Sequence, residues 1–256
     1  LGTEFGGKIE AIGKKVSSFK VGDRVFGFVD DGLIGSHAEY MVIAEDKAIT
    51  KIPNNINYEQ AAASCEGAHY AYNAINKIDL QSNHKVLING ASGGIGSAAV
   101  QIVKYYGAYV TAVCNTKNIE LVKSLGADKV IDYMKEDFTS EQQQYDLVLD
   151  AVGKSTFAKC KSLLNPQGVY ISSELGPMIQ NLFFALVTPL FRKKKVIFPL
   201  PLNCKRSLLL IKQLIEEGKF ISIIDRKYPL EEIVQAYKYV EKGQKTGNVV
   251  INVAYE

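Results

Sequence analysis

The chain has few of the residues that build disulfide-linked or metal-bound small domains. Its 256 residues include no tryptophan, three histidines and four cysteines. The cysteines form no CxxC pair, so neither a disulfide framework nor a zinc knuckle is indicated; they are Cys65, Cys114, Cys160 and Cys204. A net charge of only +3 gives no electrostatic argument for a nucleic-acid partner. These features predict a cytoplasmic protein.

Long apolar runs are also missing. The most apolar segment, residues 178–188, is confined by Pro177 and Pro189 and is too short to span a bilayer. It favours a helix in the core or at a subunit interface over a helix on a membrane surface. The residues that follow Leu1 show no signal-peptide pattern and indicate a cut in a longer chain. An apolar content of 47% is enough for the core of one or two domains.

One short stretch carries a chemical signature. KVLINGASGGIG, residues 85–96, is an apolar run that leads into four glycines, and apolar residues at helical spacing continue over 97–106. This pattern predicts a strand, a tight turn and a helix. Glycines let the backbone approach a pyrophosphate, and the free N–H groups at a helix start favour negative charge. A tight turn without a ligand is the alternative explanation.

Strands and helices continue to alternate after this motif. The strands are apolar throughout, which is typical of a parallel sheet covered on both faces. The predicted strands are 109–114, 129–133, 145–150, 168–172 and 195–201, and the predicted helices are 119–125 and 157–164. The pattern predicts a doubly wound dinucleotide-binding fold.

The first part of the chain has a different texture. Short β-like runs at 6–13, 21–26 and 37–43 are separated by glycine and aspartate turns, and the run at 247–253 resembles them. The simplest architecture is a nucleotide-binding domain inserted into a β-rich domain. We predict a β-rich domain of residues 1–54 and 222–256, and a dinucleotide-binding domain of residues 55–221.

The glycines can be aligned in two registers. The register Gly90-x-x-x-Gly94-x-Gly96 resembles the short-chain dehydrogenases, whose catalytic tyrosine is followed four positions later by a lysine that lowers its pKa. None of the fourteen tyrosines of this chain has a lysine at that offset. The short-chain register is therefore rejected.

The register Gly90-x-x-Gly93-x-x-Gly96 resembles the medium-chain dehydrogenase/reductase superfamily. The same resemblance extends along the chain through GTEFGG at 2–7, GDRV at 22–25, AAA at 61–63, LGAD at 125–128, DAVG at 150–153 and GNVVI at 247–251. It implies an α/β chain in which a Rossmann doubly wound parallel sheet is inserted in a partial GroES-like β-barrel domain. The family has further barrel strands before Leu1, so the chain is expected to lack part of the catalytic domain.

The next question is whether the protein binds zinc. The zinc-dependent alcohol dehydrogenases have a histidine ligand where this chain has Thr3, a cysteine or similar ligand near Glu66, and commonly a four-cysteine loop where residues 27–35 contain none. The histidines are scattered, whereas tetrahedral zinc needs several convergent ligands. We predict no metal. The chain then resembles the zinc-independent quinone oxidoreductase branch, the zeta-crystallin-like enzymes.

That resemblance implies an NADPH-dependent oxidoreductase that transfers hydride to a quinone or an activated alkene or carbonyl acceptor. An enoyl or alkene reductase on the same scaffold is the alternative, and a non-catalytic NADPH-binding module is a third possibility. No catalytic acid is assigned. The resemblance places four candidates at the substrate pocket: Thr3, Glu4, Cys65 and Glu66.

The second strand of the nucleotide-binding fold suggests the cofactor preference. NAD-preferring folds end this strand with an acid that binds the ribose 2′-hydroxyl, but here no acid occurs before Glu120. We therefore predict NADPH. With the residues that the resemblance adds, the predicted cofactor-binding set is Gly90, Ser92, Gly93, Gly94, Ile95, Gly96, Asn115, Thr116, Lys117, Tyr133, Val152, Gly153 and Asn248.

The last predicted strand suggests self-association. Residues 195–201 end in prolines, and the apolar segment 178–190 that precedes them is larger than a single edge helix needs. In the family, the matching strand pairs with its copy from a second subunit. An exposed apolar edge would promote aggregation, so we predict a homodimer that acts on a small-molecule acceptor.

Overall fold

The computed structural model describes residues 2–29, 35–191 and 193–253. The chain forms two compact units. The first unit consists of Leu1–His69 and Leu202–Glu256, and the second unit consists of Tyr70–Pro201. The limits of these units differ from the domain boundaries predicted at 54/55 and 221/222. Those boundaries remain a prediction, because units defined by contacts need not coincide with the two domains.

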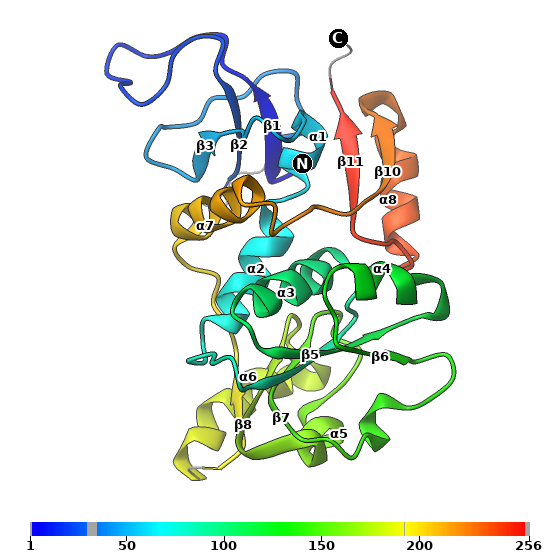
Figure 1. Ribbon diagram of the computed structural model, residues 1–256. Coiled ribbons are helices and arrows are strands. Elements are labelled where there is room, and N and C mark those ends of the chain that lie inside the picture. The colour runs from blue at the N-terminus through cyan, green and yellow to red at the C-terminus, as the bar shows by residue number, and fades with distance from the viewer. Residues whose placement is uncertain (1, 30–34, 192, 254–256) are drawn as a thin grey trace. The chain divides into compact units, whose positions relative to one another are not determined.

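The unit Tyr70–Pro201 is built on one six-stranded parallel sheet (Figure 1). Its strands are β4 (Lys85–Asn89), β5 (Tyr109–Cys114), β6 (Lys129–Asp132), β7 (Tyr145–Asp150), β8 (Leu164–Ser172) and β9 (Lys195–Ile197). The order is β6-β5-β4-β7-β8-β9, so the chain reverses its direction of travel between β4 and β7. The predicted doubly wound parallel sheet is confirmed.

Helices cover both faces of this sheet. Helices α3 (Gly94–Tyr105) and α4 (Ile119–Ser124) lie on one face, and α5 (Phe157–Cys160) lies on the other (Figure 1). The α5 face holds a cluster of fully buried side chains that includes Leu87, Val148 and Tyr170. Phe157 of α5 and Phe184 of α6 (Gln180–Val187) pack on this cluster with ring centroids 5.5 Å apart.

Two elements differ in length from their predictions. The helix predicted at 157–164 ends earlier, because β8 begins at Leu164 and runs through Pro166. The β7–β8 register shifts in this part of the strand, where a residue without an N–H donor is tolerated. The strand predicted at 195–201 ends at Ile197, before the two prolines.

The first unit combines two segments that are far apart in the sequence, Leu1–His69 and Leu202–Glu256. It contains an antiparallel sheet of β1 (Glu4–Lys8), β2 (Arg24–Phe28) and β3 (Ile49–Lys51), and a parallel pair of β10 (Ile224–Pro229) with β11 (Asn248–Asn252). The remaining helices are α1 (Tyr58–Ala62), α2 (Glu66–Ile75), which continues into the second unit, α7 (Cys204–Glu216) and α8 (Ile233–Glu241). Phe26, Phe28 and Leu208 belong to its buried apolar cluster.

Short 3₁₀ turns complete the described structure. They are η1 (Thr116–Asn118), η2 (Phe138–Ser140), η3 (Lys161–Leu163), η4 (Pro177–Ile179), η5 (Thr188–Phe191) and η6 (Leu230–Glu232). The strand predicted at 37–43 is wrong, because this segment is irregular and exposes Tyr40 and Val42. Part of the cysteine-free loop at 27–35, residues 30–34, lies outside the described residues.

Helix α6 is only partly a core helix. Phe184 and Ala185 pack on the buried cluster, whereas Phe183 is 61% exposed and Leu186 is 72% exposed. The helix therefore presents an apolar face that the described residues leave uncovered. Within the described part of the chain, no helix combines the length and apolar character that a bilayer crossing requires.

Candidate functional site

The parallel strands of the second unit end at one edge of the sheet. Asn89, Asp150 and Ser172 lie side by side across β4, β7 and β8 in the strand register, and Cys114 pairs with Asp132 across β5 and β6. In open α/β sheets, ligands bind outside the carboxyl ends of the strands, where the strand order reverses. This edge is therefore the candidate cofactor site.

The glycine loop between β4 and α3 turns tightly at this edge. Gly90 has a φ of +79°, and a Cβ there would lie 2.4 Å from Cγ1 of Val152. A Cβ on Gly96 would lie 2.1 Å from the carbonyl oxygen of Gly90 and 2.8 Å from Cα of Ala91. A Cβ on Gly93 would instead meet only the Gly90 oxygen, at 3.5 Å. The structure thus has no space for a side chain at Gly90 or Gly96, but it has space for one at Gly93.

The start of α3 is suited to an anion. Gly93 is its N-cap, and no side chain caps the first turn. The first N–H groups of a helix lack partners within the helix, and the helix dipole favours negative charge there. Ser92, Gly93, Gly94 and Ile95 are half-buried, so the turn is reachable from solvent. The predicted loop residues therefore form a cradle that fits a pyrophosphate.

A buried carboxylate holds the neighbouring turn in place. Asp150 is fully buried, and it accepts hydrogen bonds from Asn89 Nδ2 at 3.0 Å, Ser155 N at 2.8 Å and Tyr170 Oη at 3.3 Å. Burial, together with the Asp150 charge, raises the pKa of Tyr170, so this phenol stays a donor. These bonds order the turn that carries Val152 and Gly153, two of the predicted cofactor residues.

A second polar network lies at the end of β5 and β6. The Thr116 hydroxyl donates to Asp132 Oδ2 at 2.6 Å, and the backbone N–H of Met134 donates to Oδ1 at 3.1 Å. These bonds, the Thr116 bond above all, lower the pKa of Asp132. The acid at the end of β6 is thus already engaged by Thr116, Met134 and Lys135, whose Nζ is 3.7 Å away.

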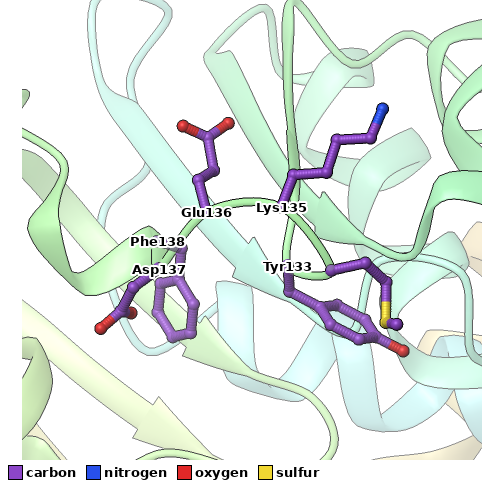
Figure 2. A pocket seen from close by; sticks show the side chains of 6 residues that line it. Tyr133, Lys135, Glu136, Asp137 and Phe138 are labelled. Atoms are coloured by element: carbon purple, nitrogen blue, oxygen red, sulfur yellow. The ribbon is translucent and has the colours of Figure 1, made fainter.

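The segment after β6 forms an open hollow of about 410 Å³. Figure 2 shows the Tyr133 and Phe138 rings on one side of this loop and Lys135 and Glu136 projecting on the other. Tyr133 is 51% exposed, so its ring and hydroxyl are available to a ligand. Tyr133 lines this hollow, but none of the glycines of the loop between β4 and α3 does.

Two enclosed polar atoms at the sheet edge lack a hydrogen-bond partner. They are Asn115 Oδ1, after β5, and Ser173 Oγ, after β8. A buried polar atom without a partner costs roughly 1–3 kcal/mol, so both atoms are available to hydrogen-bond a ligand at this edge. Asn115 belongs to the predicted set. Ser173 does not, although its place directly after an apolar strand was a usable signal.

The predicted pocket residues of the first unit make one cluster. The Thr3 hydroxyl donates to Glu66 Oε2 at 2.9 Å, and the backbone N–H of Glu66 donates to Glu4 Oε1 at 2.6 Å. Glu4 is half-exposed as a residue, but its carboxyl group is enclosed. Burial raises the pKa of this carboxyl to about 7, and the Glu66 N–H opposes the shift.

Cys65 and Asn248 have structural partners in the same unit. Cys65 is 2% exposed and donates to the carbonyl of Ala61 at 3.5 Å, and burial raises the pKa of its thiol. The Asn248 amide donates to Ala63 O at 3.0 Å and Ile223 O at 3.2 Å. Among the described residues, no three histidine, cysteine or carboxylate side chains converge as metal ligands do.

Family models match both parts of the chain. The alcohol dehydrogenase GroES-like domain matches residues 1–54, and a model described as a zinc-binding dehydrogenase matches residues 125–251. These matches and the fold define the class of dehydrogenases that combine a GroES-like domain with a nucleotide-binding domain. The chain belongs to the medium-chain dehydrogenase/reductase family.

Curated relatives and a solved structure narrow the resemblance. A 2-methylene-furan-3-one reductase of Solanum lycopersicum is 33% identical over 98% of this chain, which spans 63% of that protein. The chloroplast envelope quinone oxidoreductase homolog of Arabidopsis thaliana is 32% identical over 97% of this chain and 78% of its own length. A quinone oxidoreductase from Coxiella burnetii has a TM-score of 0.88 at 27% identity, covering 99% of this chain and 79% of its own.

The glycine geometry predicts unequal effects of the same added atom. We expect Gly96→Ala to destabilise the ligand-free protein by about 1–3 kcal/mol, because the new Cβ overlaps backbone. We expect Gly93→Ala to leave the stability nearly unchanged. Urea unfolding of both variants measures the difference, and equal losses would contradict the described loop.

The enclosed Glu4 carboxyl predicts a pH-dependent stability. Its folded pKa of about 7 lies above the unfolded value of 4.5, so the folded state binds the proton more tightly. The resulting stabilisation is present at low pH and is lost as the pH rises from about 4.5 to 7, by at most about 1.4 kcal/mol per pH unit. Glu4→Gln should therefore gain stability relative to wild type between pH 5 and pH 8.

Glu45→Gln is the control for this measurement. The backbone N–H groups of Ser18 and Ser17 lower the pKa of Glu45, so its contribution does not change between pH 5 and pH 8. Urea midpoints at four pH values would give both differences. A Glu4→Gln curve parallel to that of wild type would show that the carboxyl is solvated.

Proposed function

We propose that the protein is an NADPH-dependent oxidoreductase that reduces a quinone or an activated alkene or carbonyl compound without a metal ion. The observation that carries the proposal is the glycine loop, where Gly93 alone of the three motif glycines leaves space for a ligand. The unpartnered Asn115 Oδ1 and Ser173 Oγ at the same sheet edge support a bound cofactor there. NADPH, when bound, supplies the hydride.

The acceptor class is supported by the names of the relatives. One is a 2-methylene-furan-3-one reductase, whose named substrate is an alkene beside a ketone, and another is a quinone oxidoreductase homolog. In both chemistries the acceptor oxygen gains negative charge as hydride arrives, so the site must provide a proton or hydrogen-bond donors. An enoyl or alkene reductase is the alternative within this class.

The first unit offers a route for that proton. The Thr3 hydroxyl is bonded to Glu66, and Glu66 is bonded through its N–H to Glu4. Because the pKa of Glu4 is about 7, this cluster holds a proton near neutral pH. We propose that the Glu4 carboxyl, which is protonated below about pH 7, is the source of the proton that the reduced acceptor takes up. Cys65 takes no part, since its buried thiol donates to a backbone carbonyl.

The residues that follow β5 and β6 favour NADPH over NADH. Glu120 is paired with Lys123 at 2.9 Å, and Asp132 is engaged by Thr116, so neither offers a free carboxylate for a ribose 2′-hydroxyl. Lys117 supplies positive charge, and Tyr133 supplies an exposed hydroxyl for a 2′-phosphate. A cytoplasmic location stays a prediction; the Arabidopsis relative is named for the chloroplast envelope.

The activity is tested by following NADPH oxidation with a soluble quinone, an enone and an enoyl thioester. We expect turnover with the quinone or the enone and no loss of rate after treatment with a chelator. Turnover with the thioester alone would support the enoyl reductase. NADPH binding without turnover on any acceptor would support a non-catalytic module and overturn the proposed reaction. Gly93→Val should abolish NADPH-induced thermal stabilisation, with the exposed Gly13→Val as its control.

The cofactor preference has its own test. Calorimetry should give tighter binding of NADPH than of NADH, and Lys117→Glu should erode the difference, because the new carboxylate repels a 2′-phosphate. Lys15→Glu makes the same charge change at an exposed position of the other unit. We expect that control to keep the preference. Equal affinities in wild type would refute NADPH specificity.

We also propose a homodimer. Strand β9 pairs only with β8 in the described structure, and the exposed Phe183 and Leu186 lie on α6, which packs beside β9. Light scattering at micromolar concentration should give twice the mass of the chain. Leu186→Glu should lower that mass, whereas Val234→Glu, at an exposed position on α8, should not. A wild-type monomer would rule the dimer out.

A further inference from the structure

One segment without acidic residues carries the excess positive charge of the chain. Residues 175–201 contain no aspartate or glutamate, and their basic residues are Arg192, Lys193, Lys194 and Lys195. The whole chain has 30 basic and 27 acidic residues, so the rest of it has 26 basic and 27 acidic residues. The net charge of +3 is therefore not spread evenly, because this one segment of the second unit accounts for it.

The same segment exposes large apolar side chains on both sides of α6. Met178 is 98% exposed and Ile179 is also exposed, and Leu190 in η5 is 79% exposed. Met178 and Ile179 have φ values of +48° and +59°, a left-handed backbone that is uncommon for residues other than glycine and is unfavourable for an isoleucine. Soluble proteins rarely expose several large apolar side chains together unless the surface binds a partner.

The rest of the segment is bonded to the sheet. Phe184 packs on the buried cluster, and the Thr188 hydroxyl donates to its carbonyl at 2.7 Å and accepts the N–H of Val196 in β9 at 2.9 Å. Asn181 is buried, and its Nδ2 donates to the carbonyl of Glu174 at 2.8 Å. The exposed apolar side chains therefore project from a segment that is held in place at several points.

Lysines lie beside the exposed Leu190. Lys193 and Lys194 follow it closely in the chain, and Lys194 Nζ donates to the carbonyl of Lys161 at 2.7 Å, which places a third lysine nearby. The ion pairs formed by the described residues involve none of these three lysines. The positive charge next to the apolar side chains is thus available to an anionic partner.

We propose that this segment docks the protein on the surface of an anionic lipid bilayer. The docking surface consists of three apolar and three basic residues: Met178, Ile179, Leu190, Lys161, Lys193 and Lys194. The apolar side chains enter the boundary between headgroups and acyl chains, and the ammonium groups lie among the negatively charged headgroups. The protein lies on the bilayer and does not cross it.

Docking goes beyond the proposed reaction and has a consequence for it. A quinone of low polarity dissolves in the bilayer, so a docked enzyme lies next to the phase that contains such an acceptor. This consequence rests on the proposed function, whereas docking itself requires neither NADPH nor an acceptor.

A second copy of the chain is the other candidate partner for the docking surface. In a two-fold symmetric dimer the same surface meets itself, which would bring the lysines of both copies together, and like charges oppose association. The proposed dimer uses the edge of β9 and Leu186 in α6, and it does not require Met178 or Leu190. An anionic bilayer matches both the charge and the apolar side chains of the surface.

Vesicle co-sedimentation of the whole protein tests the docking. We expect binding to phosphatidylcholine vesicles that contain about one third phosphatidylserine, and at least about tenfold weaker binding to pure phosphatidylcholine. Salt at about 1 M shortens the screening length to about 3 Å, so it should weaken binding to the anionic vesicles. Absence of binding to the anionic vesicles, or equal binding to both kinds, would overturn the proposal.

A pair of lysine substitutions tests the electrostatic contribution. Lys193→Gln combined with Lys194→Gln should weaken binding to the anionic vesicles by roughly fivefold per lysine. Lys14→Gln combined with Lys15→Gln removes the same charge from two exposed neighbours in the first unit and should leave binding nearly unchanged. Equal losses in the two double variants would show that binding depends on net charge alone and would contradict the proposed surface.

A pair of apolar substitutions tests the insertion. Met178→Ser combined with Leu190→Ser should weaken binding to the anionic vesicles at least about tenfold, because apolar burial is lost while the charge is kept. Val234→Ser, at an exposed position on α8, is the control and should bind as wild type does. Thermal unfolding of each variant checks the fold. Wild-type binding by the Met178→Ser, Leu190→Ser protein would overturn the proposal.

The oligomeric state and the activity separate the remaining explanations. Light scattering should give the Met178→Ser, Leu190→Ser protein the same mass as wild type; a lower mass would show that a second copy covers this surface and would overturn the docking. Vesicle binding by a protein without reductase turnover would support the docking and contradict the proposed reaction. Turnover without vesicle binding would do the reverse.

Discussion

The buried carboxylate of Asp150 is the constraint on which the nucleotide-binding half depends. A charge enclosed among apolar strands is stable only when its lone pairs are occupied, and Asn89, Ser155 and Tyr170 occupy them from β4, the following turn and β8. Because each donor comes from a different segment, this one carboxyl group fixes three strand ends together. The side chain of Val152, carried by the same turn, then closes over Gly90 and completes the glycine loop.

Much of the structure of this half could be predicted from local sequence patterns. Apolar strands without alternation indicated the parallel sheet, and glycine spacing indicated the loop, because both follow from backbone geometry and burial. The contacts that tune the loop were not predictable. Which atoms enclose Gly96 depends on where Gly90 and Ala91 fold back, and two partners of Asp150, Asn89 and Tyr170, come from residues distant in the chain.

The other half shows the limits of local patterns. Residues 37–43 have the apolar content of a strand, yet they form no strand pairing with the described residues, and Val42 is exposed. Strand β10 was not predicted, since its parallel partner β11 lies beyond an intervening helix. The Glu4 carboxyl has no sequence signal for its enclosure, because Glu66 and Lys245, which act on it, lie far away along the chain.

The division of the chain also has a consequence during synthesis. The unit Tyr70–Pro201 is continuous in sequence, so all of its strands are translated before Leu202–Glu256. The other unit needs Leu202–Glu256, since Asn55 bonds to Ile215, Gln60 to Ser222 and Ala63 to Asn248. Domains generally fold as units in the order of their emergence. The sheet that carries the glycine loop is thus expected to fold first, while strands β1 to β3 wait until Leu202–Glu256 has been translated.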